Sequence, residues 1–348
     1  MPGRPTVLPE RRKPPGSPDR AGDGAKTPAS APTPGSRPVL PPIRLLKESL
    51  VKSWLHRADV KASPYLYISP FFLLFGLLGA FPLLYTAWVS LHDWSLLEDQ
   101  HPFIGLQNYR DLFADSFFWN ALGNTASMWV IATVPQLLFA LLLAHILNNR
   151  LRGQTLWRTG LLLPNVTSVV AVAIIFGQLF GRDYGMINWV LGLFGVGHID
   201  WQAGTATSHI AISVMIIWRW TGYNALIYLA AMQAVPESLH EAAILDGATS
   251  MQRLWRITIP SIRPTIIFTV IVATIGGMQV FAEPLLFGGG SLTGGSDRQF
   301  QTLAQYLYEV GFGRFDFGYA SATAWLMFLV IVVAAMLNFL LIRRIRRA

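Results

Sequence analysis

Cysteine is absent from this chain of 348 residues, and its absence excludes a disulfide framework, a thiolate nucleophile and sulfur ligands for a metal ion. The seven histidines are scattered, and none belongs to a metal-ligand pair such as His-Glu-x-x-His. No combination of serine, histidine and an acid can be argued from spacing to be catalytic. The sequence therefore predicts neither a catalytic set nor a metal site.

Charge is also scarce: only 13% of the residues are Asp, Glu, Lys or Arg, whereas 52% are hydrophobic. That balance is unusual for a soluble domain and typical of a protein with several membrane spans. A helix needs about 20 apolar residues to cross the hydrocarbon layer, and backbone groups in lipid must be satisfied within the segment. We therefore predict an all-α integral membrane protein. Its six transmembrane helices are expected at approximately 67–91, 124–147, 160–180, 209–232, 264–287 and 319–342.

The positive charges predict the orientation of these helices. If the N-terminus lies inside, the inner loops and the C-terminal segment carry ten arginines and the outer loops carry four, in agreement with the positive-inside rule. We expect both termini to be cytoplasmic. The net charge of +8 is then mostly a topology signal and gives no reason to propose nucleic-acid binding. The inner arginines are Arg150, Arg152, Arg158, Arg253, Arg256, Arg263, Arg343, Arg344, Arg346 and Arg347, and the outer ones are Arg110, Arg182, Arg298 and Arg314.

The segment before the first span has a different composition. Residues 1–42 hold twelve of the 22 prolines and almost nothing that could form a core, so we expect a disordered cytoplasmic tail. The tail lacks the apolar core and cleavage site of a secretory signal. Residues 43–64 are basic and mildly amphipathic. This stretch could lie along anionic headgroups or form a solvated linker helix.

A polar insert interrupts the apolar sequence between the fourth and fifth spans. Its alanines allow two backbones to approach closely, and Gly247 permits a turn with positive φ. The carboxylates of Glu241 and Asp246 can meet basic groups of a partner. Such a turn between helices predicts a compact docking knob at the inner membrane face. The competing interpretation is a glycine-terminated surface helix with solvated carboxylates.

Residues 236–264, PESLHEAAILDGATSMQRLWRITIPSIRP, resemble the EAA loop of permease subunits of binding-protein-dependent ATP-binding-cassette importers. Further segments resemble the maltose-type sugar permeases, and the likeness covers roughly residues 65–342. Leu254 departs from the family pattern, which commonly has Phe there, and the outer loop 92–123 is too short for an extra outer domain. The resembling segments are FIGLQNYRDLF (103–113), Asn124-Thr125, Gly185-Met186-Ile187-Asn188, 220–236, Gly288–Gly290 and Ala320-Ser321-Ala322.

The resemblance implies the MetI-like fold of ABC importer permeases in a bacterial cell membrane. It implies that the knob fits a cleft on an ATPase subunit, and that the chain forms half of a pathway for a sugar or oligosaccharide. The implied partners are a second homologous permease, two cytoplasmic ATPase subunits and an extracellular solute-binding protein. ATP and Mg would be bound by the ATPase subunits, so no cofactor is expected in this chain. The implied coupling residues are Glu241, Ala242, Ala243, Asp246, Gly247, Ala248 and Pro260.

Alternative transport functions share parts of this pattern. A permease for peptides, phosphate or glycerol phosphate would have the same inner loop but not the 103–113 segment. An ion-coupled secondary carrier would be expected to show inverted repeats and a buried carboxylate relay, and neither is found.

Polar residues within two spans are candidates for the solute pathway. Arg219 lies near the middle of the fourth span, where an ionised side chain costs at least about 2.5 kcal/mol unless it faces protein or water. We expect it either to line the pathway or to join helices through a carboxylate such as Glu283. Trp220, Tyr223 and Asn224 share one helical face by their i, i+3, i+4 spacing.

In the fifth span, Gln279 and Glu283 are expected to share a face by their i, i+4 spacing, with Pro284 breaking the helix at the glycine-rich segment. Aromatic rings and amides suit a sugar, whose hydroxyls need partners once water is removed. The competing interpretation is that these groups satisfy one another between helices.

Overall fold

The computed structural model describes residues 63–98, 100–149 and 152–345. The predicted tail 1–42 and nearly all of the predicted basic segment 43–64 lie outside the described residues, and both stay predictions. The chain divides into two compact units, 1–71 and 72–348, and all helices from residue 72 onward belong to the second unit. The described part is helical, with isolated β-bridges but no strand.

Within the described residues, four helices are long and apolar enough to cross a membrane, or up to six if each of two bent pairs counts as one span. One bent pair covers most of the third predicted window; of the other pair only the second helix falls in the fifth window. The single helices are Ser63–Val89, which contains η1 (Gly76–Ala80) and α2 (Phe81–Val89), then α4 (Ser116–Leu147), α8 (Thr205–Gln233) and α15 (Phe317–Ile345). The pairs are α5 (Gln154–Val166) with α6 (Val169–Leu179), and Ser250–Ser261 with α12 (Arg263–Met278).

The third window is bent by 89° between α5 and α6. Pro164 lies in the last turn of α5, where it cannot donate a hydrogen bond to the preceding turn. Thr167 and Ser168 then adopt extended backbone angles. The window therefore consists of two helices that meet at a sharp bend and is not one straight helix.

The fifth window is also interrupted, and here one prediction is wrong. Helix α12 ends at Met278, and α13 (Ala282–Phe287) begins after a three-residue break. Gly276 and Gly277, which weaken a helix relative to alanine, occupy the last turn of α12. Pro284 lies inside the first turn of α13 instead of ending a helix. Gln279 and Glu283 thus do not share a face of one continuous helix.

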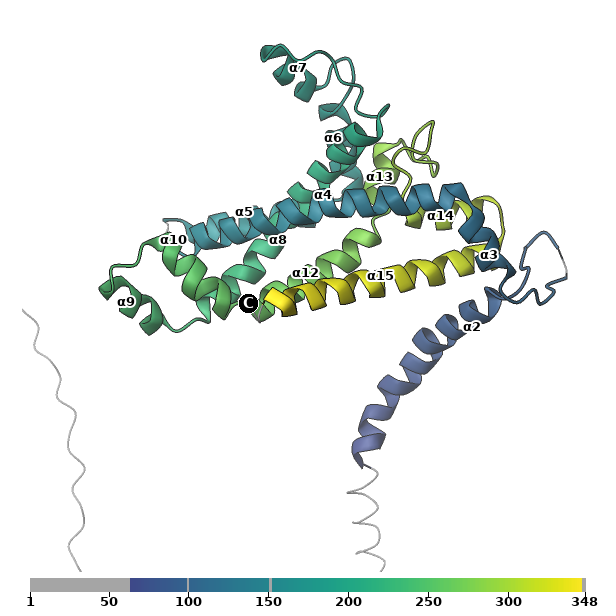
Figure 1. Ribbon diagram of the computed structural model, residues 1–348, viewed down its shortest axis with the longest axis horizontal. Helices are drawn as coiled ribbons and strands as arrows, with labels where there is room; N and C mark the ends of the chain where they lie inside the picture. The colour runs from purple at the N-terminus through teal and green to yellow at the C-terminus, as the bar shows by residue number, and fades with distance from the viewer. Residues whose placement is uncertain (1–62, 99, 150–151, 346–348) are drawn as a thin grey trace, which may run out of the picture. The chain divides into compact units, whose positions relative to one another are not determined.

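Helices α4 and α8 pack side by side at the centre of the second unit (Figure 1). Met128 and Ala132 of α4 are buried with Ile212 and Met215 of α8 in one apolar cluster. Helix α5 packs against α8, and α12 packs against both α4 and α15. These contacts hold the polar face of α8 opposite the break between α12 and α13.

The connections gather at two ends of the helices. One end, called the α9 end, carries α9 (Glu237–Leu245), α10 (Ser250–Arg253), η2 (Leu254–Thr258) and α11 (Ile259–Ser261). The other, called the α13 end, carries α3 (Gln107–Ala114), α7 (Met186–Leu193), α13, α14 (Leu303–Tyr308) and η3 (Glu309–Gly313).

Three buried asparagines from the family-like segments organise loops of the α13 end. Asn108 donates hydrogen bonds to the carbonyls of Ser90 and His92, both at 2.9 Å. Asn124 donates to the carbonyl of Arg298, also at 2.9 Å. Asn188 accepts a hydrogen bond from the indole of Trp201 and donates to loop carbonyls. At these three positions the sequence resemblance lies in residues that fix loop backbone, because a buried carbonyl without a partner is costly.

Candidate functional site

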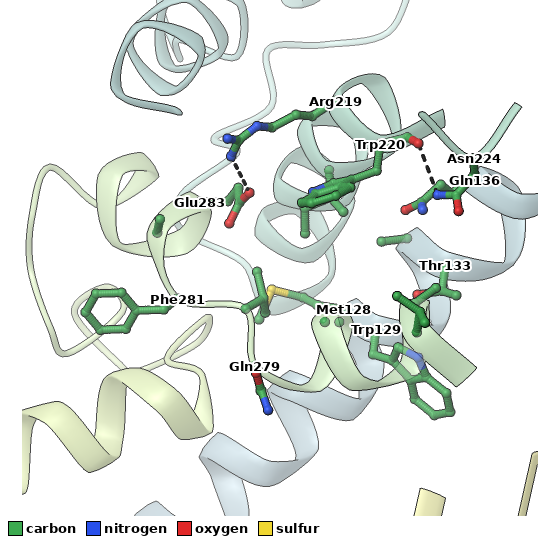
Figure 2. A pocket seen from close by; sticks show the side chains of 18 of the residues that line it. Met128, Trp129, Thr133, Gln136, Arg219, Trp220, Asn224, Gln279, Phe281 and Glu283 are labelled. Atoms are coloured by element: carbon green, nitrogen blue, oxygen red, sulfur yellow. Dashed lines mark hydrogen bonds and ion pairs between the residues drawn. The ribbon is translucent and has the colours of Figure 1, made fainter. Parts of the chain in front are cut away.

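A cavity of about 490 Å³ lies between α4, α8 and the break that separates α12 from α13. Figure 2 shows its polar and aromatic side chains approaching from these three elements. Five of the six predicted pathway residues come from α8 and α13, and the sixth from the break. All six line this cavity: Arg219, Trp220, Tyr223, Asn224, Gln279 and Glu283.

Arg219 and Glu283 form an ion pair across the cavity wall. Arg219 Nη1 donates to Glu283 Oε1 at 3.1 Å, and the two side chains are only 18% and 10% exposed (Figure 2). The buried Nε of Arg219 has no hydrogen-bond partner among the described residues. The sequence left open whether Arg219 would line the pathway or join helices; in the structure it lines this cavity and joins α8 to α13 through Glu283.

The predicted shared face of α8 is confirmed. The rings of Trp220 and Tyr223 meet edge to face, with centroids 6.0 Å apart. Asn224 is buried and donates to the carbonyl of Trp220 at 3.1 Å. Trp220 and Tyr223 remain 37% and 42% exposed, so this face offers aromatic surface and one amide to the cavity.

Gln279 reaches the cavity from the break after α12 and not from a helical face. It is exposed, and in Figure 2 its amide points away from the Arg219–Glu283 pair. The prediction that Gln279 and Glu283 would act from one helical face is therefore replaced by two separate positions on the cavity wall.

Helix α4 supplies cavity residues that the sequence analysis missed. Trp129, Thr133 and Gln136 line the cavity at i, i+4 and i+7, and Thr133 and Gln136 are buried. The available signal was the pair Thr133 and Gln136: the span has no Asp, Glu, Lys or Arg, and two polar residues three apart lie on one face of a helix. Gly277 of α12 lies against Trp129, and a Cβ there would come within 2.6 Å of the indole Cδ1.

The α9 end carries the predicted coupling segment. Helix α9 ends in a Schellman motif, in which Gly247 donates to the carbonyl of Ile244 and Ala248 to that of Ala243. Gly247 has φ +78°, as its position in the sequence predicts. Thr249 and Gln252 then form a capping box that starts α10. The chain therefore makes a sharp turn between two short helices.

Within the described residues, the outer surface of α9 has no cover. Glu241, Ala242, Asp246 and Gly247 are exposed, while Ala243 and Ala248 are partly exposed. Leu245 is 89% exposed, and no residue of α9 is buried. Pro260 follows in α11 and is exposed as well. Figure 1 shows α9 beyond α10, away from the packed helices.

A network of charged and phenolic groups closes the α13 end. Glu309 accepts hydrogen bonds from Arg298 and Gln301, both at 2.6 Å, and from Arg314 at 3.0 Å. The Arg298 guanidinium and these other donors lower the pKa of Glu309 to about 2, although burial opposes the shift. Burial would also raise the pKa of Asp115, but hydrogen bonds from Tyr306, the Phe117 amide and Tyr319 outweigh it and lower that pKa.

Within the described part of the chain, no three His, Asp or Glu side chains are grouped so that they could hold a metal ion. The cavity carries a few polar groups on largely apolar walls and lies beside helices long enough to span a membrane, and among the described residues nothing covers the helix turn at the α9 end. These features are typical of a membrane transport subunit.

The chain belongs to the family of binding-protein-dependent transport system inner membrane components, whose model matches residues 125–347. It is therefore a multi-pass membrane protein. A lactose transport system permease protein of Rhizobium radiobacter is 36% identical over 79% of this chain and 92% of its own length. A trehalose/maltose transport system permease protein of Thermococcus litoralis is 31% identical over 81% of this chain and 94% of its own length.

The fold likeness extends to solved structures. A chain of a bacterial alginate ABC transporter, crystallised with an alginate pentasaccharide-bound periplasmic protein, superposes with a TM-score of 0.69. It is 21% identical, and the match covers 86% of this chain and 97% of that one. The expected permease fold is thus confirmed.

Proposed function

We propose that this chain is the permease subunit of an ATP-driven importer and forms half of the translocation pathway for a sugar or oligosaccharide. The observation that carries the substrate class is the cavity, which combines the rings of Trp129, Trp220 and Tyr223 with the amides of Gln136 and Asn224. Aromatic faces can cover the apolar face of a sugar ring, and amides and hydroxyls can replace the water that its hydroxyls lose. Relatives named for lactose and for trehalose/maltose support this class.

In this proposal α9 is the part that receives force from an ATPase subunit. Its exposed alanines and Leu245 would enter a cleft on that subunit, and Glu241 and Asp246 would meet basic groups there. The α9 end would then be cytoplasmic and the α13 end would face the solute-binding protein. A second homologous permease would complete the cavity, and two ATPase subunits would bind ATP and Mg.

The proposal is tested by reconstitution in proteoliposomes. The chain would be combined with the second permease, the ATPase and the solute-binding protein encoded beside it, and uptake of labelled lactose, maltose and arabino-oligosaccharides measured. The proposal predicts uptake that requires both ATP and the binding protein. Uptake of a peptide or glycerol phosphate alone would contradict the sugar assignment, and uptake driven by an ion gradient without ATP would contradict the importer class.

A further inference from the structure

We infer that the ion pair between Arg219 and Glu283 determines whether the pathway accepts neutral or charged sugars, and that it selects neutral sugars over acidic ones. The inference rests on the proposed sugar pathway. It concerns a specificity that follows from the charges of the cavity rather than from its shape.

The charges that line the cavity are balanced. Among the residues that line the cavity, Arg219 and Glu283 alone are ionisable at neutral pH, and their formal charges cancel. The other polar groups in the lining, such as Thr133, Gln136 and Asn224, are uncharged. This chain's side of the pathway therefore presents hydrogen-bonding groups without net charge.

The contact between Arg219 and Glu283 uses few of the available donors. Only one contact, from Nη1 to Oε1 at 3.1 Å, joins the two groups, although a guanidinium can bind a carboxylate through two parallel hydrogen bonds. Arg219 Nε is buried and has no partner among the described residues. Glu283 thus accepts from only one of the Arg219 donors while it compensates the charge of Arg219.

Glu283 is buried in the cavity wall, with only 7% of the residue exposed. A sugar carboxylate that approached Arg219 would lie beside this buried carboxylate, and like charges in a poorly solvated site repel strongly. If Glu283 lost its charge, Arg219 would become an uncompensated buried cation. An acidic sugar would then supply the missing anion, so Glu283→Gln should convert a site for neutral sugars into one for acidic sugars.

The test measures equilibrium binding to the complete complex of both permeases and both ATPase subunits in nanodiscs. The solute-binding protein is omitted, so that its own preference does not enter. The probes are matched pairs: radiolabelled methyl lactoside or methyl maltoside, and the same glycoside after oxidation of its primary hydroxymethyl groups to carboxylates. The wild type should bind the neutral member about tenfold more tightly, because the acid would place two carboxylates together.

Glu283→Gln should shift this ratio by about tenfold or more toward the acid, because Arg219 then lacks its anion. The double variant Arg219→Gln/Glu283→Gln should bind the neutral member but show no increase in affinity for the acid. Asp297→Asn, which removes a carboxylate outside the cavity lining, should leave the ratio unchanged. If Glu283→Gln does not assemble, Arg219→Gln serves in its place and should favour the corresponding 6-amino glycoside over the neutral one.

Three outcomes separate the hypotheses. The predicted shifts support charge selection by the pair. Sugar binding with an acid-to-neutral ratio that neither single variant changes overturns the inference, leaves the proposed function standing and makes the pair only a link between α8 and α13. If no form of the complex binds any of the glycosides, the proposed sugar pathway itself is overturned.

Discussion

Gly222 of α8 faces the backbone carbonyl oxygen of Leu161 on α5 so closely that a Cβ at this position would lie 1.8 Å from that oxygen. The two helices can approach only because residue 222 has no side chain. Since Gly222 lies between Trp220 and Tyr223, the same contact fixes the part of α8 that faces the cavity.

Gly222→Ala should therefore destabilise the protein by about 1–3 kcal/mol, because a backbone carbonyl cannot move aside as a flexible side chain can. The measurement is the thermal unfolding midpoint of the purified protein in detergent. Gly160→Ala on α5 is the matched control, because the added Cβ meets nothing within 4 Å. Equal midpoints for the two variants would show that α5 and α8 are not in this contact.

Acid should remove the stabilising contribution of Glu309. The pKa of Glu309 is lowered from 4.5 to about 2 by Arg298 and its other partners, so its contribution is complete above about pH 4.5 and disappears as the pH falls toward 2. The difference in unfolding midpoint between the wild type and Glu309→Gln should shrink over that interval. Asp297→Asn removes an exposed carboxylate from the loop that carries Arg298, outside the Glu309 hydrogen bonds, and should show no comparable trend. A difference that does not change with pH would contradict the charged network.

Single introduced thiols test the orientation without background, because the chain has no native cysteine. Ser250 and Asp297 are both exposed and lie at opposite ends of the helices. Ser250→Cys should be protected from an impermeant maleimide in intact cells and labelled after permeabilisation. Asp297→Cys should be labelled in both conditions. Labelling of Ser250→Cys from outside would reverse the proposed topology.

Tyr223→Ala and Gln279→Ala should raise the solute concentration required for half-maximal uptake, or lower the transport rate, without loss of assembly or basal ATPase activity. Both side chains line the cavity, and each substitution removes a contact available to a sugar. Trp218→Ala is the control on the same helix, since Trp218 is 44% exposed but is not part of the lining. Unchanged uptake kinetics in both cavity variants would remove this face from the pathway.

Local pattern explains what could be predicted from the sequence. The apolar windows, the shared face of Trp220 with Tyr223 and the positive φ of Gly247 each depend on neighbours within one or two turns, so spacing alone identifies them. The break at 279–281 could not be predicted in the same way. Gly276 and Gly277 are tolerated within many helices, and here the break places Glu283 against Arg219.

Contacts between distant segments could not be predicted from the sequence either. The contribution of α4 to the cavity depends on how α4 packs against α8 and α12, which no single span encodes. Arg298 meets Glu309 through an irregular loop in which Arg298 itself has φ +54°. Periodicity carries no information about such a loop, and the charges there indicated only which side of the membrane it would face.

The most direct test of the account is whether the turn after α9 transmits the action of the ATPase. The double variant Glu241→Lys/Gly247→Val reverses one exposed charge and places a branched side chain at residue 247, where φ is +78°. Gly195→Val is the matched control, because Gly195 has the same φ and equally open surroundings in the loop after α7. Copurification with the ATPase subunit and ATP-driven uptake are measured for both variants in membranes that contain equal amounts of the chain. The account predicts that the double variant loses both properties while Gly195→Val keeps them. Normal copurification and uptake by the double variant would contradict it and reduce the α9 turn to a solvated surface helix.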